Sequence, residues 1–504
     1  MPLNKKSYEL ANPNPEFLIK SIAEQGYSLE TALADLMDNS ITANATKIEV
    51  LTKIDDEPFT LFISDNGDGM DEVSLKNNMQ FPSKSPEQER DFGDLGRFGL
   101  GLKTASFSQT RCFTVLSRKK GSTKYYGLTW DVNYLKEIGE WRIIINSEEE
   151  IEETIKLYNS ISENHLNKFE DFNPNTIVIW KGLYKFENYI NISNKQDALK
   201  NEITSNTSEY LSIVFHRFME RKFNPLNIRI NNEIVRAFNP FPTGNELRAI
   251  EPLHRDFGND HIKIQGFVLP NSSIKETNES VNIWTPINRS LMDMEGIYIY
   301  RADRLILFGG WNGIIRKMPR LQLARLKVDI GNKVDHLFHL NVAKSQINIP
   351  YDLKQAFYRA IITLKDEAQK EYFNHGIKSF PAKPKEENSQ LFYKIATNKG
   401  VLLAVNNEFP LLKSLKSSLK KEQQAELNFI LKISSSLINT IRQVENVELS
   451  GDTVKDGISN DEILKSISKL ISLGFSKEQI KKDFIPNLGI KVNNLPKELA
   501  KILS

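Results

Sequence analysis

Residues 31–42 read TALADLMDNSIT, and the predicted fold depends on this stretch. Apolar residues recur at helical spacing around it and predict a helix within residues 17–45. Asp35 and Asn39 are four residues apart, so they share one face of that helix, one turn from each other. A carboxylate and an amide placed in this way suit a site that holds a water molecule beside a Mg²⁺ ion. The alternative is an ordinary amphipathic helix with a solvated polar stripe.

A loop with two glycines follows a predicted strand and reads DNGDGM over residues 65–70. A buried carboxylate at Asp65 would accept a hydrogen bond from the exocyclic amine of adenine, a contact that guanine does not offer. Gly67 and Gly69 allow the backbone to turn tightly and to approach the base. The alternatives are a strand-ending turn and a calcium loop, but an EF-hand needs a glutamate at its twelfth position, which is Lys76 here.

A third segment is rich in glycine and reads GDLGRFGLGLKT over residues 93–104. Glycines in a loop that runs into a helix expose backbone N–H groups to phosphate oxygens, and the helix dipole strengthens this attraction. A Rossmann loop would follow the first strand of a βαβ unit directly, whereas this segment follows a polar loop of about 20 residues. A Walker P-loop is absent because the pattern GxxxxGK[ST] does not occur. Thr176, which opens the strand TIVIW, is a fourth polar position.

In this order, the four segments resemble the N, G1, G2 and closing motifs of the GHKL superfamily. That superfamily comprises gyrase B subunits, heat-shock chaperones, histidine kinases and MutL, with the microrchidia-type ATPases as relatives. The resemblance covers residues 20–183. It implies an α+β protein with an N-terminal Bergerat-fold α/β sandwich that binds ATP and Mg²⁺. A second, transducer-like α/β domain and a helical C-terminal region complete the predicted fold.

The resemblance also assigns roles to positions that match the motifs. It implies that Asn39 ligates Mg²⁺ and that Asp65 binds the adenine amine. Further nucleotide contacts are expected from Asp38, Gly67, Gly69, Met70, Lys84, Gly96, Arg97, Phe98, Gly99, Leu100, Gly101, Lys103, Thr104 and Thr176.

One position departs from the family pattern. Most relatives that hydrolyse ATP have a glutamate four residues before the asparagine, whereas this chain has Asp35, which is shorter by one methylene. Retreat of a general base by about 1 Å can cost about 10²-fold in rate. We therefore predict a slow ATPase in which Asp35 is the catalytic base and Asp38 is the alternative carboxylate. An ATP-binding scaffold that does not hydrolyse is the other interpretation.

Patterns beyond the first domain predict domains at residues 1–184, 185–375 and 376–504. In gyrase-like and MutL-like relatives the second domain places a lysine on the terminal phosphate. Lys344 is the matching candidate, and a surface lysine on a strand-to-helix turn is the alternative. A strand predicted at residues 227–230 is assigned to this second domain. The last region is mostly helical by its pattern and is expected to make dimer or partner contacts.

The client cannot be read from total charge, because 66 basic and 64 acidic residues leave a net charge of only +2. The resemblance implies a homodimer that closes on ATP and acts on DNA, with a role in DNA repair, restriction or anti-phage defence alongside a partner nuclease. A chaperone-like ATPase acting on proteins is the alternative, and a histidine kinase lacks support. A basic run supplies the candidate DNA contacts Arg316, Lys317, Arg320, Arg325 and Lys327, for which a solvated loop is the plain alternative.

Composition narrows the setting of the protein. The 504 residues are 40% hydrophobic and 26% charged, which is ordinary globular usage. The single cysteine, Cys112, excludes an internal disulfide and a cysteine-based zinc site and fits a reducing compartment. No apolar run of about 18 residues is present, so no membrane span is expected. The first ten residues lack the apolar core of a signal peptide, and we expect a cytoplasmic protein.

Overall fold

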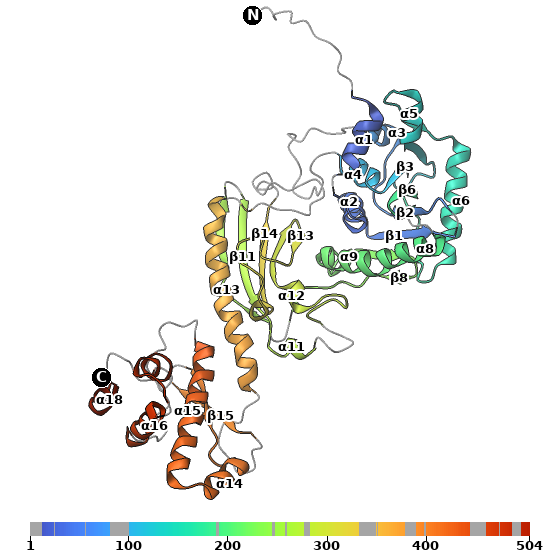
Figure 1. The fold of residues 1–504 in the computed structure, drawn as a ribbon. Helices are drawn as coiled ribbons and strands as arrows, with labels where there is room; N and C mark the ends of the chain where they lie inside the picture. The colour runs from blue at the N-terminus through green and yellow to red at the C-terminus, as the bar shows by residue number, and fades with distance from the viewer. Residues whose placement is uncertain are drawn as a thin grey trace, which may run out of the picture. The chain divides into compact units, whose positions relative to one another are not determined.

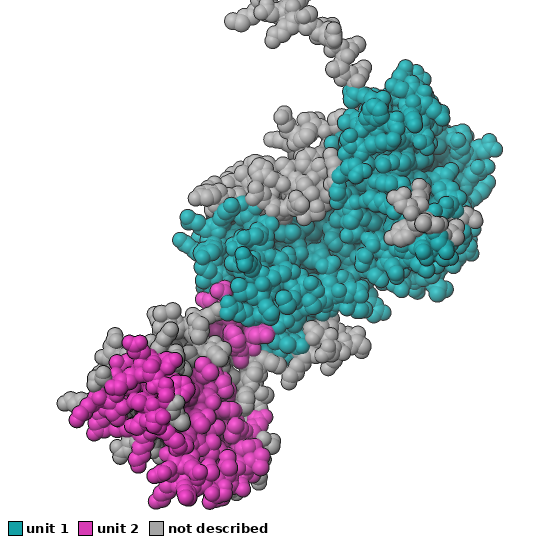
Figure 2. All heavy atoms as spheres, in the orientation of Figure 1, with its two compact units in different colours: residues 1–364 teal, residues 365–504 magenta. Residues whose placement is uncertain are grey.

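The computed structural model forms two compact units, residues 1–364 and 365–504 (Figure 2). The described residues are 13–24, 26–55, 57–80, 100–187, 191–243, 247–257, 260–276, 283–331, 349, 351–378, 390–397, 400–443, 460–472, 474–485 and 495–503.

A mixed sheet is the centre of the N-terminal part (Figure 1). In the described residues it has eight strands in the order β5-β4-β3-β6-β2-β1-β7-β8. Neighbouring strands pair antiparallel except β1 and β7, which are parallel. The strands are β1 (Lys47–Lys53), β2 (Thr60–Asp65), β3 (Thr110–Ser117), β4 (Tyr126–Asp131), β5 (Ile144–Ile145), β6 (Thr176–Leu183), β7 (Asn227–Ile230) and β8 (Glu233–Ile234).

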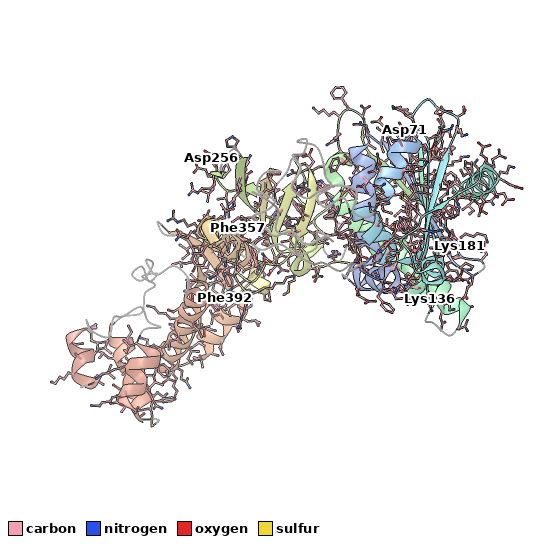
Figure 3. The ribbon with its side chains drawn as sticks, turned by 90° about the horizontal axis from the view of Figure 1, so that it is seen from above. Asp71, Lys136, Lys181, Asp256, Phe357 and Phe392 are labelled. Atoms are coloured by element: carbon pink, nitrogen blue, oxygen red, sulfur yellow. The ribbon has the colours of Figure 1, made fainter. Side chains whose placement is uncertain are left out.

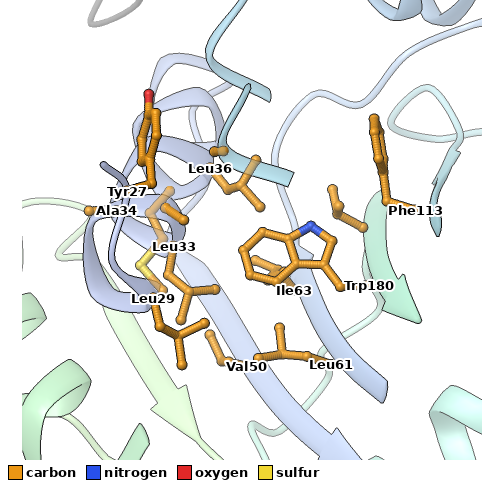
Figure 4. Packing of buried hydrophobic residues seen from close by; sticks show 14 of the residues in the cluster. Tyr27, Leu29, Leu33, Ala34, Leu36, Val50, Leu61, Ile63, Phe113 and Trp180 are labelled. Carbon is orange, nitrogen blue, oxygen red and sulfur yellow. The ribbon is translucent and has the colours of Figure 1, made fainter. Parts of the chain in front are cut away.

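Alternating side chains give this sheet two apolar faces. On one face, Leu33 and Leu36 of α2 belong to the same buried cluster as Ile63 and Trp180 of the strands (Figure 4). Because successive strand residues point to opposite sides, Phe62 lies on the other face and packs there with α6. The helices of this part are α1 (Pro15–Ala23), α2 (Leu29–Thr42), α3 (Glu72–Met79), α4 (Gly101–Phe107), α5 (Val132–Ile138) and α6 (Glu148–Asn164).

The helix predicted within residues 17–45 is two helices. Gly26 has φ +79, a left-handed backbone conformation that is typical of the residue after the end of a helix, here α1. Ser28 then caps α2 through a capping box with Thr31. The segment 147–172 contains α6, which covers one face of the sheet.

The strand at residues 227–230 lies in the first sheet, so its assignment to the second domain is wrong. It is β7, and it pairs with β1 from Lys47↔Asn227 to Val50↔Ile230. Its apolar residues join the α2-side core. On the other face, Arg229 contacts Glu49 at 2.8 Å with both side chains fully buried. That ion pair lies across the β1–β7 pairing.

A helical connector follows β6 and leads to a second sheet. The connector comprises α7 (Tyr184–Glu187), α8 (Ile192–Asn201), a π-helical segment (Glu202–Thr207), α9 (Ser208–Val214) and α10 (His216–Met219). The second sheet, within the described residues, has the order β10-β11-β14-β12-β13, with β9 beside β11. Its strands are β9 (Arg248–Ala249), β10 (Leu253–Phe257), β11 (Asp260–Val268), β12 (Gly296–Arg301), β13 (Arg304–Phe308) and β14 (Ala324–Ile330).

Helix α13 (Tyr351–Lys378) packs on this second sheet. A side chain at Gly266 of β11 would meet Leu364 of the helix at 3.3–3.4 Å, so the glycine allows the close approach. Phe357 of the same helix is fully buried (Figure 3). Short helices α11 (Ser273–Glu276) and α12 (Leu291–Met294) lie in the connections between the strands.

The C-terminal unit is mostly helical, as predicted, but it also contains a hairpin that the sequence analysis missed. The hairpin pairs β15 (Phe392–Thr397) with β16 (Gly400–Val405). Asn439 of α15 holds it by donating to and accepting from the backbone of Leu403 at 2.8 and 3.0 Å. The helices are α14 (Pro410–Ser418), α15 (Lys421–Gln443), α16 (Asn460–Ser472), α17 (Lys477–Gln479) and α18 (Lys497–Leu503). In the described part of the chain, no helix is long and apolar enough to cross a membrane.

Candidate functional site

Helix α2 presents a polar edge beside an otherwise buried surface. Its apolar residues pack on the sheet, and Asp35 is only 4% exposed. Asn39, one turn later, is exposed. The helix therefore places an amide at the surface and a carboxylate one turn deeper, on the shared face that the sequence predicts.

The Asp35 carboxylate is oriented by a residue that the sequence analysis did not single out. The buried Tyr27 hydroxyl donates to Asp35 Oδ2 at 2.7 Å. Burial, followed by the charge of Asp35, raises the pKa of Tyr27 far above its ordinary value, so the phenol stays a donor. The same hydroxyl contacts the hydroxyl of Thr104 on α4. Asp35 thus lies at the junction of α2 and α4.

Gly101 lies beside the same carboxylate. A Cβ at that position would stand 3.7 Å from Asp35 Oδ2. Backbone of the glycine-rich segment therefore approaches Asp35 where α4 begins. Gly101 therefore lies beside Asp35, and its contact with the nucleotide stays a prediction.

Asp65 ends strand β2 in a buried position prepared for a hydrogen-bonding partner. Ser40 donates to its Oδ2 at 2.8 Å and the Gly67 N–H donates to its Oδ1 at 2.9 Å. Burial raises the pKa of Asp65 to about 6, although both hydrogen bonds act to lower it. Near neutral pH it is a largely ionised acceptor held in a fixed direction. An acceptor of this kind matches the amine edge of adenine.

The loop after Asp65 has room only for glycine at two positions. A Cβ at Gly67 would lie 2.7 Å from the carbonyl oxygen of Ala43. Gly69 has φ +62, and a Cβ there would lie 1.9 Å from the carbonyl oxygen of Arg118. Both glycines are therefore needed for the close packing of the loop against its neighbours.

Thr176 and Met70 join the site through Ser117. The register pairs Thr176 with Asp65 across β6 and β2. The hydroxyl of Ser117, on β3, lies 2.9 Å from the Thr176 hydroxyl and accepts from the Met70 N–H at 2.9 Å. Asn175 closes the loop by donating to the Gly67 carbonyl at 2.7 Å. The structure thus brings these predicted residues together around Asp65.

Two predicted contacts in α4 are buried inside the fold. Lys103 is 1% exposed and donates to the Asn78 carbonyl of α3 at 2.7 Å. Burial lowers its pKa to about 8. Its assignment as a phosphate charge is therefore wrong in this arrangement, because its ammonium ties α4 to α3. Thr104 is equally buried, and its hydroxyl meets Tyr27 and the carbonyls of Leu100 and Gly101, the latter two at 3.1 and 3.3 Å. Leu100 is a half-buried residue at the start of α4.

Asp38 is buried in an ion pair with the second sheet, so its assignment as a nucleotide contact is wrong. It is 1% exposed, and Arg304 donates from Nε to its two oxygens at 3.0 and 3.3 Å. A residue directly before Asn39 points about 100° around the helix from it, which accounts for the different surroundings. Asp35 remains the candidate base.

Several predicted residues lie outside the described residues. They are Lys84, Gly96, Arg97, Phe98, Gly99 and Lys344.

The predicted DNA-contact run is divided by strand β14. Arg325 is fully buried and donates to the Pro240 carbonyl at 2.5 Å. Lys327 lies over the rings of Phe241 and Phe267 at 5.5 and 4.9 Å. The assignment of Arg325 is wrong because its side chain lies in the interior of the second domain, whereas Lys327 is half-buried and its assignment stays a prediction. Of the remaining three, Arg316 and Lys317 are exposed and Arg320 is half-buried.

The residues that the sequence analysis missed are Tyr27, Ser40, Ser117, Asn175 and Arg304. Ser40 had a usable signal, because it directly follows Asn39 on the helix that carries the motif. Tyr27 meets Asp35 from eight residues away, outside the motif itself. Ser117, Asn175 and Arg304 act through pairings between distant segments and leave no local pattern.

A comparison with protein families agrees with this geometry. Residues 27–165 match the family model described as "Histidine kinase-, DNA gyrase B-, and HSP90-like ATPase". The match begins at the tyrosine that contacts Asp35 and includes α2, the glycine loop after β2 and α4. A search among curated proteins returned no match to the chain.

Proposed function

The N-terminal domain is a GHKL-type ATPase domain, and from this premise we propose that the protein is a slow, Mg²⁺-dependent ATPase working as a conformational clamp. The observation that carries the proposal is the pair of polar positions on α2 and β2. Asp65 is a buried acceptor fixed by two donors, and Asn39 is an exposed amide one turn from a buried carboxylate. Adenine would bind at the first position and the phosphates near the second.

Mg²⁺ fits the ligands that α2 offers. Asn39 supplies an exposed amide oxygen, and the described residues contain no group of three or more His, Cys, Asp or Glu that would form an all-protein cage. Mg²⁺ prefers oxygen ligands and usually keeps waters and phosphate oxygens, so one protein ligand suffices. When bound, it would neutralise phosphate charge.

Asp35 is proposed as the general base for the attacking water. Its Oδ2 is held by Tyr27, and its carboxylate adjoins the first residue of α4. A fixed carboxylate loses little entropy when it must meet a water in one direction. Its short side chain gives the reason to expect slow turnover.

Calorimetry and steady-state hydrolysis test the proposal together. The wild-type protein should take up ADP and ATP with Mg²⁺ and release phosphate slowly. Asp35→Asn should keep binding and reduce kcat by about 10²-fold or more, in line with the loss of a general base. Asn39→Ala should weaken binding only in the presence of Mg²⁺. No uptake of either nucleotide by the folded protein would refute the function.

The clamp itself is proposed from the resemblance to gyrase-like and MutL-like ATPases. In this view ATP binds the closed, dimeric state more tightly and so shifts the equilibrium toward it. Light scattering with a non-hydrolysable ATP analogue measures this directly. A mass that stays monomeric with the analogue bound would remove the clamp while leaving the ATPase in place.

DNA is the proposed client, in repair, restriction or defence with a partner nuclease. Exposed Arg316, with Lys317 beside it, supports this choice. Arg316→Glu should weaken a salt-sensitive gel shift and flatten its salt slope, whereas Lys222→Glu, the same charge change at another exposed position of this unit, should act less. Protection of unfolding proteins without any gel shift would favour a chaperone-like ATPase instead.

A further inference from the structure

A buried ion pair connects the nucleotide-site helix to the second sheet. Arg304 opens β13, and its Nε lies 3.0 and 3.3 Å from the two oxygens of Asp38, 266 residues earlier in the chain. Both side chains are at most 3% exposed. Helix α2 and strand β13 of the second sheet are therefore joined by a buried ion pair.

The guanidinium is held on several sides. Its Nη1 donates to the Leu305 carbonyl at 2.6 Å, and the group lies 5.2 Å from the Phe215 ring centroid. The guanidinium also donates a hydrogen bond to the hydroxyl of the half-buried Tyr210. Burial by itself lowers the pKa of Arg304, but the charge of Asp38, then those of Tyr210 and Asp35, raise it overall. Arg304 therefore stays charged and fixed in direction.

Asp38 transmits this constraint to the residues that would meet the nucleotide. It directly precedes Asn39 and follows Asp35 by three residues, within one turn of the same helix. Fixing both Asp38 oxygens sets the rotation of α2 about its axis. The same rotation determines where the Asp35 carboxylate and the Asn39 amide point.

Stability alone gives little reason for two charges at this position. Buried ion pairs are often no more stabilising than a well-packed apolar pair of similar volume. What an apolar pair does not provide is direction, because Arg304 donates along fixed N–H vectors. The contact is therefore better suited to setting an orientation than to holding the domains together.

We propose that Arg304 is a positioning residue of the ATPase site, supplied by the second sheet. The site is then correctly aligned only while β13 is docked behind α2, which makes turnover sensitive to the second domain. This inference rests on the proposed ATPase function and adds a residue to it that no family motif assigns. Arg304 acts through Asp38, and no contact with the nucleotide is assigned to it.

The test uses the full chain with Arg304→Lys and the double variant Asp38→Leu/Arg304→Met. The double variant removes both charges together, so neither is left buried without its partner. Arg217→Met is the matched control. Arg217, on the helical connector, likewise forms ion pairs with the second sheet, to Asp329 at 2.6 Å and Asp303 at 3.6 Å, but it has no ion pair with α2 among those of the described residues. Each protein is measured for thermal unfolding, ADP affinity, kcat, KM and amide hydrogen exchange over residues 29–42.

The double variant should fold and bind ADP within about 3-fold of wild type, since Asp65 is untouched, while kcat falls at least about 10-fold with little change in KM. Arg304→Lys should recover part of that loss, and exchange over residues 29–42 should rise in the double variant alone. The control should keep kcat within about 2-fold of wild type. A folded double variant with wild-type kcat and wild-type exchange over residues 29–42 would overturn the positioning role and leave the proposed function in place. A wild-type protein that takes up no nucleotide would overturn the proposed function. In that case, unchanged exchange in the double variant would refute the positioning role as well.

Discussion

Asp65→Asn should weaken nucleotide binding while leaving the protein as stable as wild type or more so. The substitution keeps the shape of the side chain but removes its charge. In the wild type, Asp65 accepts from Ser40 and from the Gly67 N–H at 2.8 and 2.9 Å while buried. An asparagine retains one acceptor oxygen for Gly67, but its amide presents donors where the adenine amine would also donate.

The substitution should weaken nucleotide binding but not stability, because binding depends on the hydrogen bond to adenine and stability depends on the cost of burying the charge. Burial raises the pKa of Asp65 from 3.8 to about 6, which means the folded state penalises the ionised form by about 3 kcal/mol. A raised carboxyl pKa contributes stability below the unfolded pKa and loses it as pH rises through the folded pKa. At pH 8 the penalty is present in full, and a neutral asparagine escapes it. Loss of a charged hydrogen bond to adenine costs about 1.5–3 kcal/mol, or roughly 10- to 150-fold in Kd.

Binding also has a pH signature in the wild-type protein. Protonation of Asp65 removes an acceptor for the amine, so affinity for ADP should fall as pH drops below about 6. Asp65→Asn should show no such dependence from this group. Calorimetry with ADP at pH 5.5, 6.5 and 8, beside urea unfolding at the same pH values, measures both quantities on one preparation.

An Asp65→Asn variant that unfolds at lower urea concentration at pH 8, and loses affinity by the same free energy, would refute this explanation. That result would make Asp65 a structural acceptor for Ser40 and Gly67 whose loss disturbs the loop. Wild-type affinity in the variant would likewise remove adenine from this end of the pocket.

Further predictions concern the proposed general base, the glycine loop after β2 and the buried ion pair between Arg229 and Glu49. Tyr27→Phe should lower kcat about 2- to 10-fold with little change in the Kd for nucleotide, because one hydrogen bond to Asp35 is worth about 0.5–1.5 kcal/mol. A kcat equal to that of the wild type would mean that the phenol does not orient the base. Gly69→Ala should lower the melting temperature by several degrees, because its Cβ would meet a backbone carbonyl at 1.9 Å and its φ is +62. Gly26→Ala is the control, because Gly26 has φ +79 and open space around the added Cβ, so that variant measures the backbone cost alone. Equal shifts in melting temperature would contradict the role of packing at Gly69. Arg229→Met should cost about 3–5 kcal/mol in urea unfolding because it leaves the Glu49 carboxylate buried without its cation, and a loss under about 1 kcal/mol would show that Glu49 takes up a proton or water instead.

Local patterns were sufficient to predict much of the first domain. Helix α2 follows from apolar periodicity, a strand is expected before the glycine loop, and the spacing of Asp35, Asn39 and Asp65 leads to the proposed site. Such patterns are set by neighbours along the chain, which a sequence displays directly. Two of the chemical assignments made from them, Asp38 and Lys103, are wrong because burial depends on what packs from elsewhere.

Long-range pairing accounts for the rest. β7 has four residues, and nothing in them specifies β1 as a parallel partner rather than a strand of the second sheet. A basic run likewise does not reveal that β14 passes through it and carries Arg325 into the interior. The contact between Asp38 and Arg304 spans 266 residues, so neither position signals the other.

The two ends of the proposed site differ in how firmly their residues are fixed before a nucleotide binds. At the adenine end, Asp65 is fixed by two donors, and Ser117 and Asn175 brace the loop, so binding there requires little rearrangement. At the other end, Asn39 is exposed and Asp35 depends on Tyr27 of the preceding segment and, through Asp38, on Arg304 of the second sheet. Affinity for the base should therefore be nearly constant between domain arrangements, whereas alignment of the carboxylate should change with them. An enzyme built in this way can hold its nucleotide throughout while the arrangement of the domains decides when it is hydrolysed.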